Sequence, residues 1–179
     1  MNKLRVLQIV GDPVGGIRKH VHDIFLGLKN DFDMYYISSE KGDKVYKQQI
    51  EEINEVVVEH LQLDISKKPS WKDILNLYRV FVFIRKNRID VVHGHGAKGG
   101  LYARVSGKLL NCKVIYTPHG GVVHNVFGRS ADVLYRIIER TLSHFTDLLI
   151  FESRYTADSF VKKFGCTSVE SVVNYNGIS

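Results

Sequence analysis

Apolar runs alternate with stretches of helical periodicity along the whole chain. Most of the runs are rich in Val, Ile or Tyr, and they cover residues 4–10, 33–38, 55–59, 89–93, 113–117, 147–151 and 169–174. Strands that alternate with helices predict a parallel sheet covered on both faces and joined by right-handed crossovers. The chain has 179 residues, 44% of them hydrophobic, which is enough for one core. We therefore expect a single α/β domain over residues 1–179, with a Rossmann-like, doubly wound parallel sheet of six or seven strands.

The clearest helix is SWKDILNLYRVFVFIRKN, residues 70–87. Ser70 is placed to act as the N-cap, and Asp73 is placed for a capping-box-like role. One face carries large apolar side chains at three- and four-residue steps, namely Trp71, Ile74, Leu75, Tyr78, Phe81 and Val82. We interpret this face as core packing and not as a cofactor or membrane surface.

The net charge of +6 includes two basic clusters, KKPSWK at 67–72 and RKNR at 85–88. Such clusters are typical of solvated faces, and they also leave open an attraction to anionic phosphates or to the negative cytoplasmic leaflet of a membrane. A nucleic-acid partner is not expected, because no recognition motif is present.

No apolar run approaches the roughly 18 residues of a membrane span. The N-terminus is interrupted at Gly11-Asp12 before any signal-peptide pattern. The sequence predicts a cytoplasmic protein, with contact at the inner membrane face left open.

The glycine-rich turn in LQIVGDPVGGIRKHVHDIF follows the first apolar run. The turn does not match the phosphate-binding loop of nucleotide hydrolases, because Ile17 and Arg18 stand where that loop needs Lys and then Ser or Thr. Pro13 occupies the place of the second glycine of a dinucleotide fingerprint. What remains is a strand, a Gly15-Gly16 turn and a helix whose first N–H groups suit an anion or a polar oxygen. A tight turn without a ligand is the alternative.

Polar residues follow several of the predicted strands, at the carboxyl ends where such sheets bind ligands. The blocks are HGHGAKGG, PHGGVVHNVFGRS and ESRY, and they supply His95, Lys98, His119, Gly120, Ser153 and Arg154 as candidates. His93 and His95 lie two apart on a strand and point to the same side, but no carboxylate or cysteine completes a zinc site, so no metal is expected.

His119 follows Pro118, which stiffens the strand exit, and precedes Gly120, which allows a sharp turn. An imidazole projecting into a cleft there can bind a sugar hydroxyl or stabilise charge, while a structural histidine is the alternative. No nucleophile elbow supports hydrolase chemistry.

Five segments together carry a resemblance to a known family: GDPVGGIRKHV, IDVVHGHGAKGGLYAR, KVIYTPHGG, LYRIIERTLSHFTDLLIFES and VNYNGIS. Their order and spacing resemble the N-terminal half of glycosyltransferase family 4, retaining enzymes with the GT-B fold. The resemblance implies two Rossmann-like domains, with the acceptor held mainly by the N-terminal one and the sugar nucleotide mainly by the C-terminal one. Ser179 stands where the family has an aspartate before the hinge. We therefore expect half an enzyme that lacks the donor-binding domain and is inactive alone.

The resemblance also implies roles for single residues. Gly15 and Gly16 match the glycine loop that approaches donor phosphates or the acceptor across the cleft. His119 matches the cleft histidine near the transferred sugar and is the predicted catalytic residue, while His95 and Lys98 line the acceptor side. Glu139 matches a helix position for which we expect a structural ion pair. No cofactor or metal is implied.

The interpretation that follows is the acceptor-side domain of a retaining glycosyltransferase. It would move a sugar from a sugar nucleotide to a polysaccharide or lipid-linked acceptor, with a peripheral contact on an anionic membrane. Two alternatives remain open at the level of sequence. One is the acceptor subunit of a split glycosyltransferase, and the other is a non-catalytic module that binds a sugar or a protein on a Rossmann scaffold.

Overall fold

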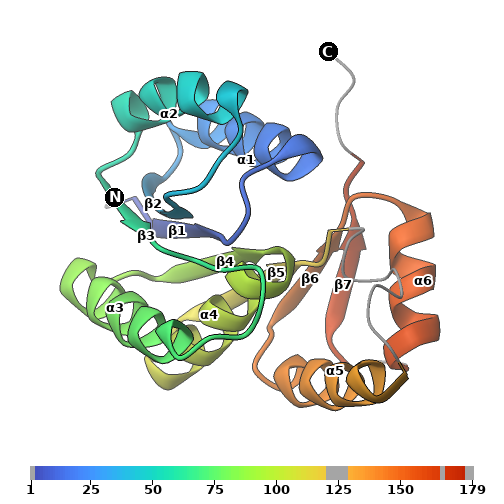
Figure 1. The fold of residues 1–179 in the computed structure, drawn as a ribbon. Coiled ribbons are helices and arrows are strands. Elements are labelled where there is room, and N and C mark those ends of the chain that lie inside the picture. The colour runs from blue at the N-terminus through green and yellow to red at the C-terminus, as the bar shows by residue number, and fades with distance from the viewer. Residues whose placement is uncertain (1–2, 120–128, 166–167, 176–179) are drawn as a thin grey trace.

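A computed structural model describes residues 3–119, 129–165 and 168–175. In this part of the chain, seven strands form one all-parallel sheet in the order β3-β2-β1-β4-β5-β6-β7 (Figure 1). The strands are β1 (Arg5–Val10), β2 (Asp33–Ser39), β3 (Glu59–Leu63), β4 (Val91–His95), β5 (Lys113–Thr117), β6 (Leu148–Phe151) and β7 (Glu170–Val173). The predicted Rossmann-like fold is confirmed.

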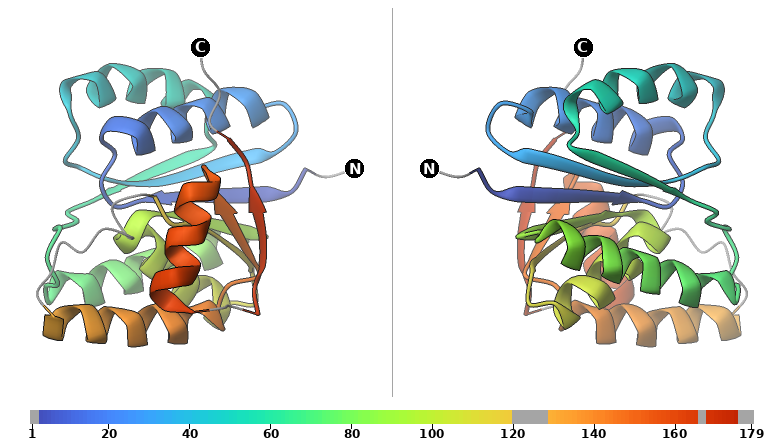
Figure 2. Two further views of the ribbon diagram at one scale, coloured as in Figure 1. Left: turned by 90° about the vertical axis from the view of Figure 1, so that its right-hand side faces the viewer. Right: turned by 90° about the vertical axis from the view of Figure 1, so that its left-hand side faces the viewer.

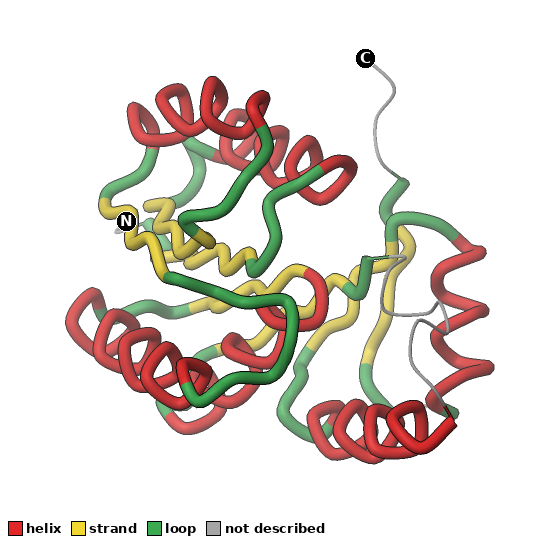
Figure 3. Tube along the Cα trace, viewed as in Figure 1, coloured by secondary structure: helices red, strands yellow, loops and turns green. Residues whose placement is uncertain are grey.

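Helices lie on both faces of the sheet, as Figures 2 and 3 show. They are α1 (Gly15–Leu28), α2 (Lys44–Val56), α3 (Lys72–Asn87), α4 (Gly96–Leu109), α5 (Arg129–Ser143) and α6 (Arg154–Phe164). α1 and α2 cover one face through a cluster that contains Val21, Phe25 and Ile53, and α3 and α4 cover the other. None of the helices in the described residues is long and apolar enough to cross a membrane.

The strand register brings the ends of the central strands to one edge. Val10 at the end of β1 pairs with His95 at the end of β4, and His95 pairs with Thr117 at the end of β5. All strands are parallel, so the segments that follow them leave from the same edge. The glycine turn at Gly15 and the histidine His119 therefore share the edge where a ligand of this fold is expected.

Two predicted strand boundaries are wrong. The run at 55–59 is not a strand, because α2 continues to Val56 and β3 begins at Glu59. The helix is fixed by its N-cap Asp43, whose Oδ1 accepts a hydrogen bond from Tyr46 N at 2.7 Å, and by buried Ile53. β3 is an edge strand in which only Leu63 is buried, so its apolar pattern is weak. The other boundary lies at β4, which runs to His95 and not to residue 93.

The prediction that this helix, α3, packs into the core through its Trp71 and Tyr78 side is wrong as well. Trp71, Ile74 and Tyr78 are 73%, 75% and 65% exposed. The buried side of α3 consists of Asn76, Val80, Phe83 and Ile84, of which the last three join the core beneath the sheet. The helix carries apolar residues on two opposite faces, and periodicity alone does not say which of them meets the sheet. The predicted capping role of Asp73 is confirmed, since its Oδ2 accepts a hydrogen bond from Ser70 N at 2.8 Å.

Candidate functional site

Four imidazoles meet at the carboxyl edge of the sheet. His93 and His95 project from the same side of β4, with ring centroids 4.0 Å apart, as their two-residue spacing predicts. His119, just after β5, places its Nε2 3.3 Å from His95 Nδ1. The ring of His20 on α1 lies 5.6 Å from that of His95 and 5.5 Å from that of His119. Strands β4 and β5 and helix α1 thus build one histidine cluster.

Hydrogen bonds extend this cluster across the centre of the sheet. His119 Nδ1 lies 2.8 Å from Glu152 Oε2, which follows β6. On the other side, His95 Nε2 lies 2.8 Å from Gln8 Oε1 in β1. With the Gln8 amide in this orientation, His95 donates from Nε2 and accepts at Nδ1, so His119 donates from Nε2.

The cluster is buried, and burial controls its charge. His93, His95 and His119 are 5%, 1% and 5% exposed. Burial lowers the pKa of His93 to about 3, with a further contribution from His20 and His119. Burial and the neighbouring imidazoles hold the pKa of His95 well below its ordinary value. Both rings are therefore neutral at neutral pH. His119 lies at the predicted edge, but its side chain points into the cluster and not into open solvent.

The helices that follow β1 and β4 both begin at a glycine with positive φ. Gly15 starts α1 with φ +54°, and Gly96 starts α4 with φ +63°. An added Cβ at Gly96 would lie 3.6 Å from Ile17 Cδ1, so the two helix starts are neighbours. Neither helix has a side-chain N-cap, whereas Asp43 caps α2 and Ser153 caps α6. Uncapped N–H groups and the helix dipole favour negative charge at such ends.

Asp43 lies close to the first turn of α1. Hydrogen bonding to Tyr46 N–H lowers the pKa of Asp43 most, and the charge of Arg18 and a hydrogen bond from Gly15 N–H lower it further against the opposing effect of burial. Arg18 Nε is 3.4 Å from Asp43 Oδ1. This carboxylate offsets part of the positive end of α1. Gly16 is exposed, and an added Cβ there would have no atom within 4 Å.

Lys98 reaches the loop that leads into α3. Its Nζ donates to the Asp73 carboxylate and to Lys68 O, the latter at 3.2 Å. The Tyr102 hydroxyl donates to the other oxygen of Asp73. Burial opposes ionisation of Asp73, but the hydrogen bonds from Lys98, Tyr102 and Ser70 hold its pKa below the ordinary value. The ammonium group of Lys98 is therefore already paired.

The remaining predicted site residues are more peripheral. Ser153 Oγ accepts a hydrogen bond from Thr156 N at 3.1 Å, so this side chain acts as the N-cap of α6. Arg154 is the exposed first residue of that helix. Gly120 lies outside the described residues. Among the described residues, no group of three or more His, Cys, Asp or Glu is arranged to hold a metal ion.

The expected structural ion pair of Glu139 is confirmed. Its partner is Arg104 on α4, with Nη1 to Oε2 at 2.7 Å and Nη2 to Oε1 at 3.0 Å. The guanidinium lies 3.9 Å over the ring centre of Tyr116 and donates from Nε to Gly100 O. Both charged side chains are almost fully buried, so removing one partner of such a pair would destabilise the fold by about 3–5 kcal/mol.

Sequence reasoning missed three members of the cluster. Gln8 is a polar residue inside an apolar run, and Glu152 directly follows the run LLIF, so both carried a signal that could have been followed. His20 was not among the candidate residues, yet its ring packs edge-on against those of His95 and His119. Its partners come from strands far away in the sequence, which local helical spacing does not reveal.

The sheet order and the polar carboxyl edge define a Rossmann-like α/β domain whose candidate site lies where the parallel strands end. The chain belongs to Glycosyltransferase Family 4, whose family model matches residues 14–179. It is 24% identical to the O-antigen biosynthesis glycosyltransferase WbnH of Escherichia coli over 166 residues, which are 92% of this chain and 46% of the relative. The chain thus spans about half the length of this relative.

A second relative in Escherichia coli is UDP-Gal:alpha-D-GlcNAc-diphosphoundecaprenol alpha-1,3-galactosyltransferase. It is 24% identical over 108 residues, which cover 60% of this chain and 28% of the relative. Among solved structures, a glycosyltransferase from Rickettsia africae ESF-5 matches with a TM-score of 0.74 and 18% identity, over 99% of this chain and 44% of that one. Anabaena Alr3699/HepE in complex with UDP and glucose matches with a TM-score of 0.71 and 16% identity, over 98% and 45%. The domain thus has the fold of the N-terminal half of a GT-B glycosyltransferase.

Proposed function

We propose that this chain is the acceptor-side domain of a retaining glycosyltransferase that moves a sugar from a sugar nucleotide to a polysaccharide or lipid-linked acceptor. The observation that carries the proposal is the meeting of His95 and His119 beside the glycine starts of α1 and α4, at the carboxyl edge of the sheet. The name of one relative, a transferase that acts on a diphosphoundecaprenol-linked sugar, supports a lipid-linked acceptor.

The donor in this proposal is a uridine-diphosphate sugar or a close analogue. The neighbour solved with UDP and glucose supports this choice. A second Rossmann-like domain would hold most of the donor, and the carboxyl edge of this domain would face it across a cleft. The uncapped start of α4 at Gly96 is suited to approach the donor phosphates, because its N–H groups and the helix dipole favour an anion. Closure of the two domains would exclude water.

In the transfer step, an acceptor hydroxyl oxygen forms a bond to the anomeric carbon of the donor sugar. The bond from that carbon to the phosphate oxygen breaks, its electron pair stays on the nucleoside diphosphate, and the hydroxyl proton passes to that phosphate oxygen. The role we assign to His119 is to hydrogen-bond the sugar and to stabilise charge during this step. Its contact with His95 is long at 3.3 Å, so a sugar hydroxyl can replace it, while Glu152 holds the other nitrogen.

The first test is whether the chain needs a donor-binding domain. We expect the 179-residue chain alone to form no glycoside from UDP-sugars and lipid-linked acceptors, because most donor-binding groups lie elsewhere. Activity should appear when that domain is supplied, either in the same polypeptide or as a separate chain. Folding of the isolated chain is checked by circular dichroism. Glycoside formation by the purified chain alone would overturn the half-enzyme proposal.

A further inference from the structure

The outer side of α3 exposes a row of apolar side chains that the core does not use. We call Trp71, Ile74, Leu75, Tyr78 and Val82 the α3 stripe, with exposed fractions between 39% and 75%. They recur at three- and four-residue steps and so lie on one side of the helix, opposite the buried face. In the right-hand view of Figure 2, α3 lies in front, and no other described element covers its outer side. A contiguous apolar patch of this kind on a monomer marks an interaction surface.

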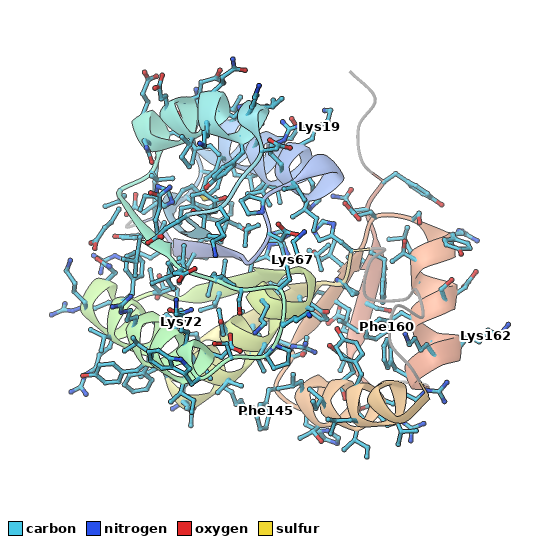
Figure 4. The ribbon with its side chains drawn as sticks, viewed as in Figure 1. Lys19, Lys67, Lys72, Phe145, Phe160 and Lys162 are labelled. Carbon is cyan, nitrogen blue, oxygen red and sulfur yellow. The ribbon has the colours of Figure 1, made fainter. Side chains whose placement is uncertain are left out.

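Basic residues border the α3 stripe. Lys72, Arg79 and Lys86 recur every seven residues, which is close to two helical turns, so they form a row along one flank. Figure 4 shows Lys72 at the helix start and Lys67 on the loop before it. Residues 67–88 contain seven Lys or Arg and one acidic residue, an excess of six that equals the net charge of the whole chain. The segment that contains α3 is thus strongly basic.

Acidic groups near α3 offset part of that charge, since Lys67 on the preceding loop pairs with Asp12 at 2.8 Å. Asp73 contacts Lys98 and Tyr102 on α4 and does not face the stripe. Lys72 pairs with Asp64, and Lys86 pairs with Glu59 at 2.9 Å. Within the described residues, Arg79 forms no ion pair. A shallow groove of about 350 Å³ lies between α3 and β3. Its lining includes Leu61, Val82 and Arg79, so it also combines apolar side chains with a basic one.

This combination fits an anionic lipid surface. Trp and Tyr favour the boundary between headgroups and acyl chains, where one end of the side chain is apolar and the other is wet. Lys and Arg beside an apolar helix face are attracted to anionic headgroups. Protein interfaces, in contrast, are depleted in lysine. The lysine-rich border therefore favours a lipid bilayer over a protein as the occupant.

We propose that the α3 stripe and its basic border dock this domain on an anionic lipid bilayer, with α3 lying along the surface. The start of α3 is tied to the candidate site, because Lys98 on α4 contacts both Lys68 and Asp73. Docking by this surface therefore places the start of α3, with the Lys98 contact behind it, on the bilayer side of the domain. The purpose of this docking rests on the proposed function, since a lipid-linked acceptor would reach the carboxyl edge of the sheet from the bilayer.

Trp71 provides a direct probe, because it is the only tryptophan in the chain and is 73% exposed. Vesicles of phosphatidylcholine with phosphatidylglycerol should bind the chain and shift the Trp71 emission to shorter wavelength, and pure phosphatidylcholine should do so about tenfold more weakly. Two double variants test the surface. The first replaces apolar residues of the stripe, Ile74→Ser with Tyr78→Ser, and the second reverses charge on its border, Lys68→Glu with Arg79→Glu. Each should weaken co-sedimentation with the anionic vesicles by about tenfold or more. Circular dichroism and thermal unfolding check that each variant is folded.

The matched control is Leu134→Ser with Ile137→Ser on α5, where both residues are as exposed as the stripe, at 59% and 57%. It should leave vesicle binding unchanged. No binding to anionic vesicles, equal weakening by the control, or binding without a Trp71 shift would each overturn the proposal. The proposal would also be overturned if the stripe variant dissociated a dimer in sedimentation and left vesicle binding unchanged, because the surface would then bind protein. Vesicle binding needs no sugar, so its failure is separate from a failure of the transferase proposal.

Discussion

His93 gives the fold a pH-dependent weakness that follows from its burial. Its pKa is lowered to about 3 in the folded chain, against about 6.5 for an unfolded histidine. Below about pH 6.5 the unfolded chain binds a proton that the folded chain does not, so the free energy of unfolding falls as the pH drops towards 3. One such group contributes a slope of up to about 1.4 kcal/mol per pH unit.

His93 Nε2 lies 2.8 Å from Thr117 Oγ1. The variant His93→Gln should flatten the slope, because glutamine can also hydrogen-bond Thr117 but does not titrate. Urea unfolding at several pH values between about 4 and 7 measures the effect. Part of the slope should remain, since burial also lowers the pKa of His95. His144→Gln, on the surface of the same chain, serves as the control and should leave the native slope unchanged. Identical pH dependence in His93→Gln and the native chain would show that His93 is not the group responsible.

At the scale of elements, α4 lies very close to the sheet because its first turn carries glycine. A Cβ at Gly99 would lie 2.3 Å from Ile9 O, and one at Gly100 would lie 2.3 Å from Tyr116 Cε2. The segment HGHGAKGG was predicted to follow its strand at the ligand edge. The structure places Gly94 in β4 and the other glycines in α4, so at least Gly99 and Gly100 serve close helix–sheet packing.

Gly99→Ala should therefore destabilise the domain by about 1–3 kcal/mol, because the backbone carbonyl of Ile9 has little room to move. The matched control is Gly27→Ala in α1, where an added Cβ meets no atom within 4 Å and the residue is exposed. That change should stabilise by about 0.5–1 kcal/mol, since alanine favours a helix interior. Thermal and urea unfolding compare the two variants. Equal stability of both would contradict the close-packing account.

For the molecule as a whole, the sequence predicted the architecture because strand and helix signals alternate without long gaps. It also predicted that Gly15, His95 and His119 would share one edge, since parallel strands all end on the same side. It did not predict the contacts that shape the site. Gln8 in β1 and Glu152 just after β6 contact the histidines from positions distant in sequence. The exposed face of α3 could not be predicted either, because apolar residues on both sides of a helix give no sign of which side meets the sheet.

The central claim is that the carboxyl edge, with His119 at its centre, takes part in sugar transfer. The most direct measurement is turnover per folded molecule of a form that includes the donor-binding domain, using the UDP-sugar that stabilises it most in a thermal screen. We predict that His119→Ala lowers turnover by about 10²-fold. It should also lower the free energy of unfolding by about 1–3 kcal/mol through lost hydrogen bonds, which is why turnover is normalised to folded protein. Surface control His144→Ala should retain native turnover. Native turnover per folded molecule in His119→Ala would contradict the claim and leave His119 with a structural role only.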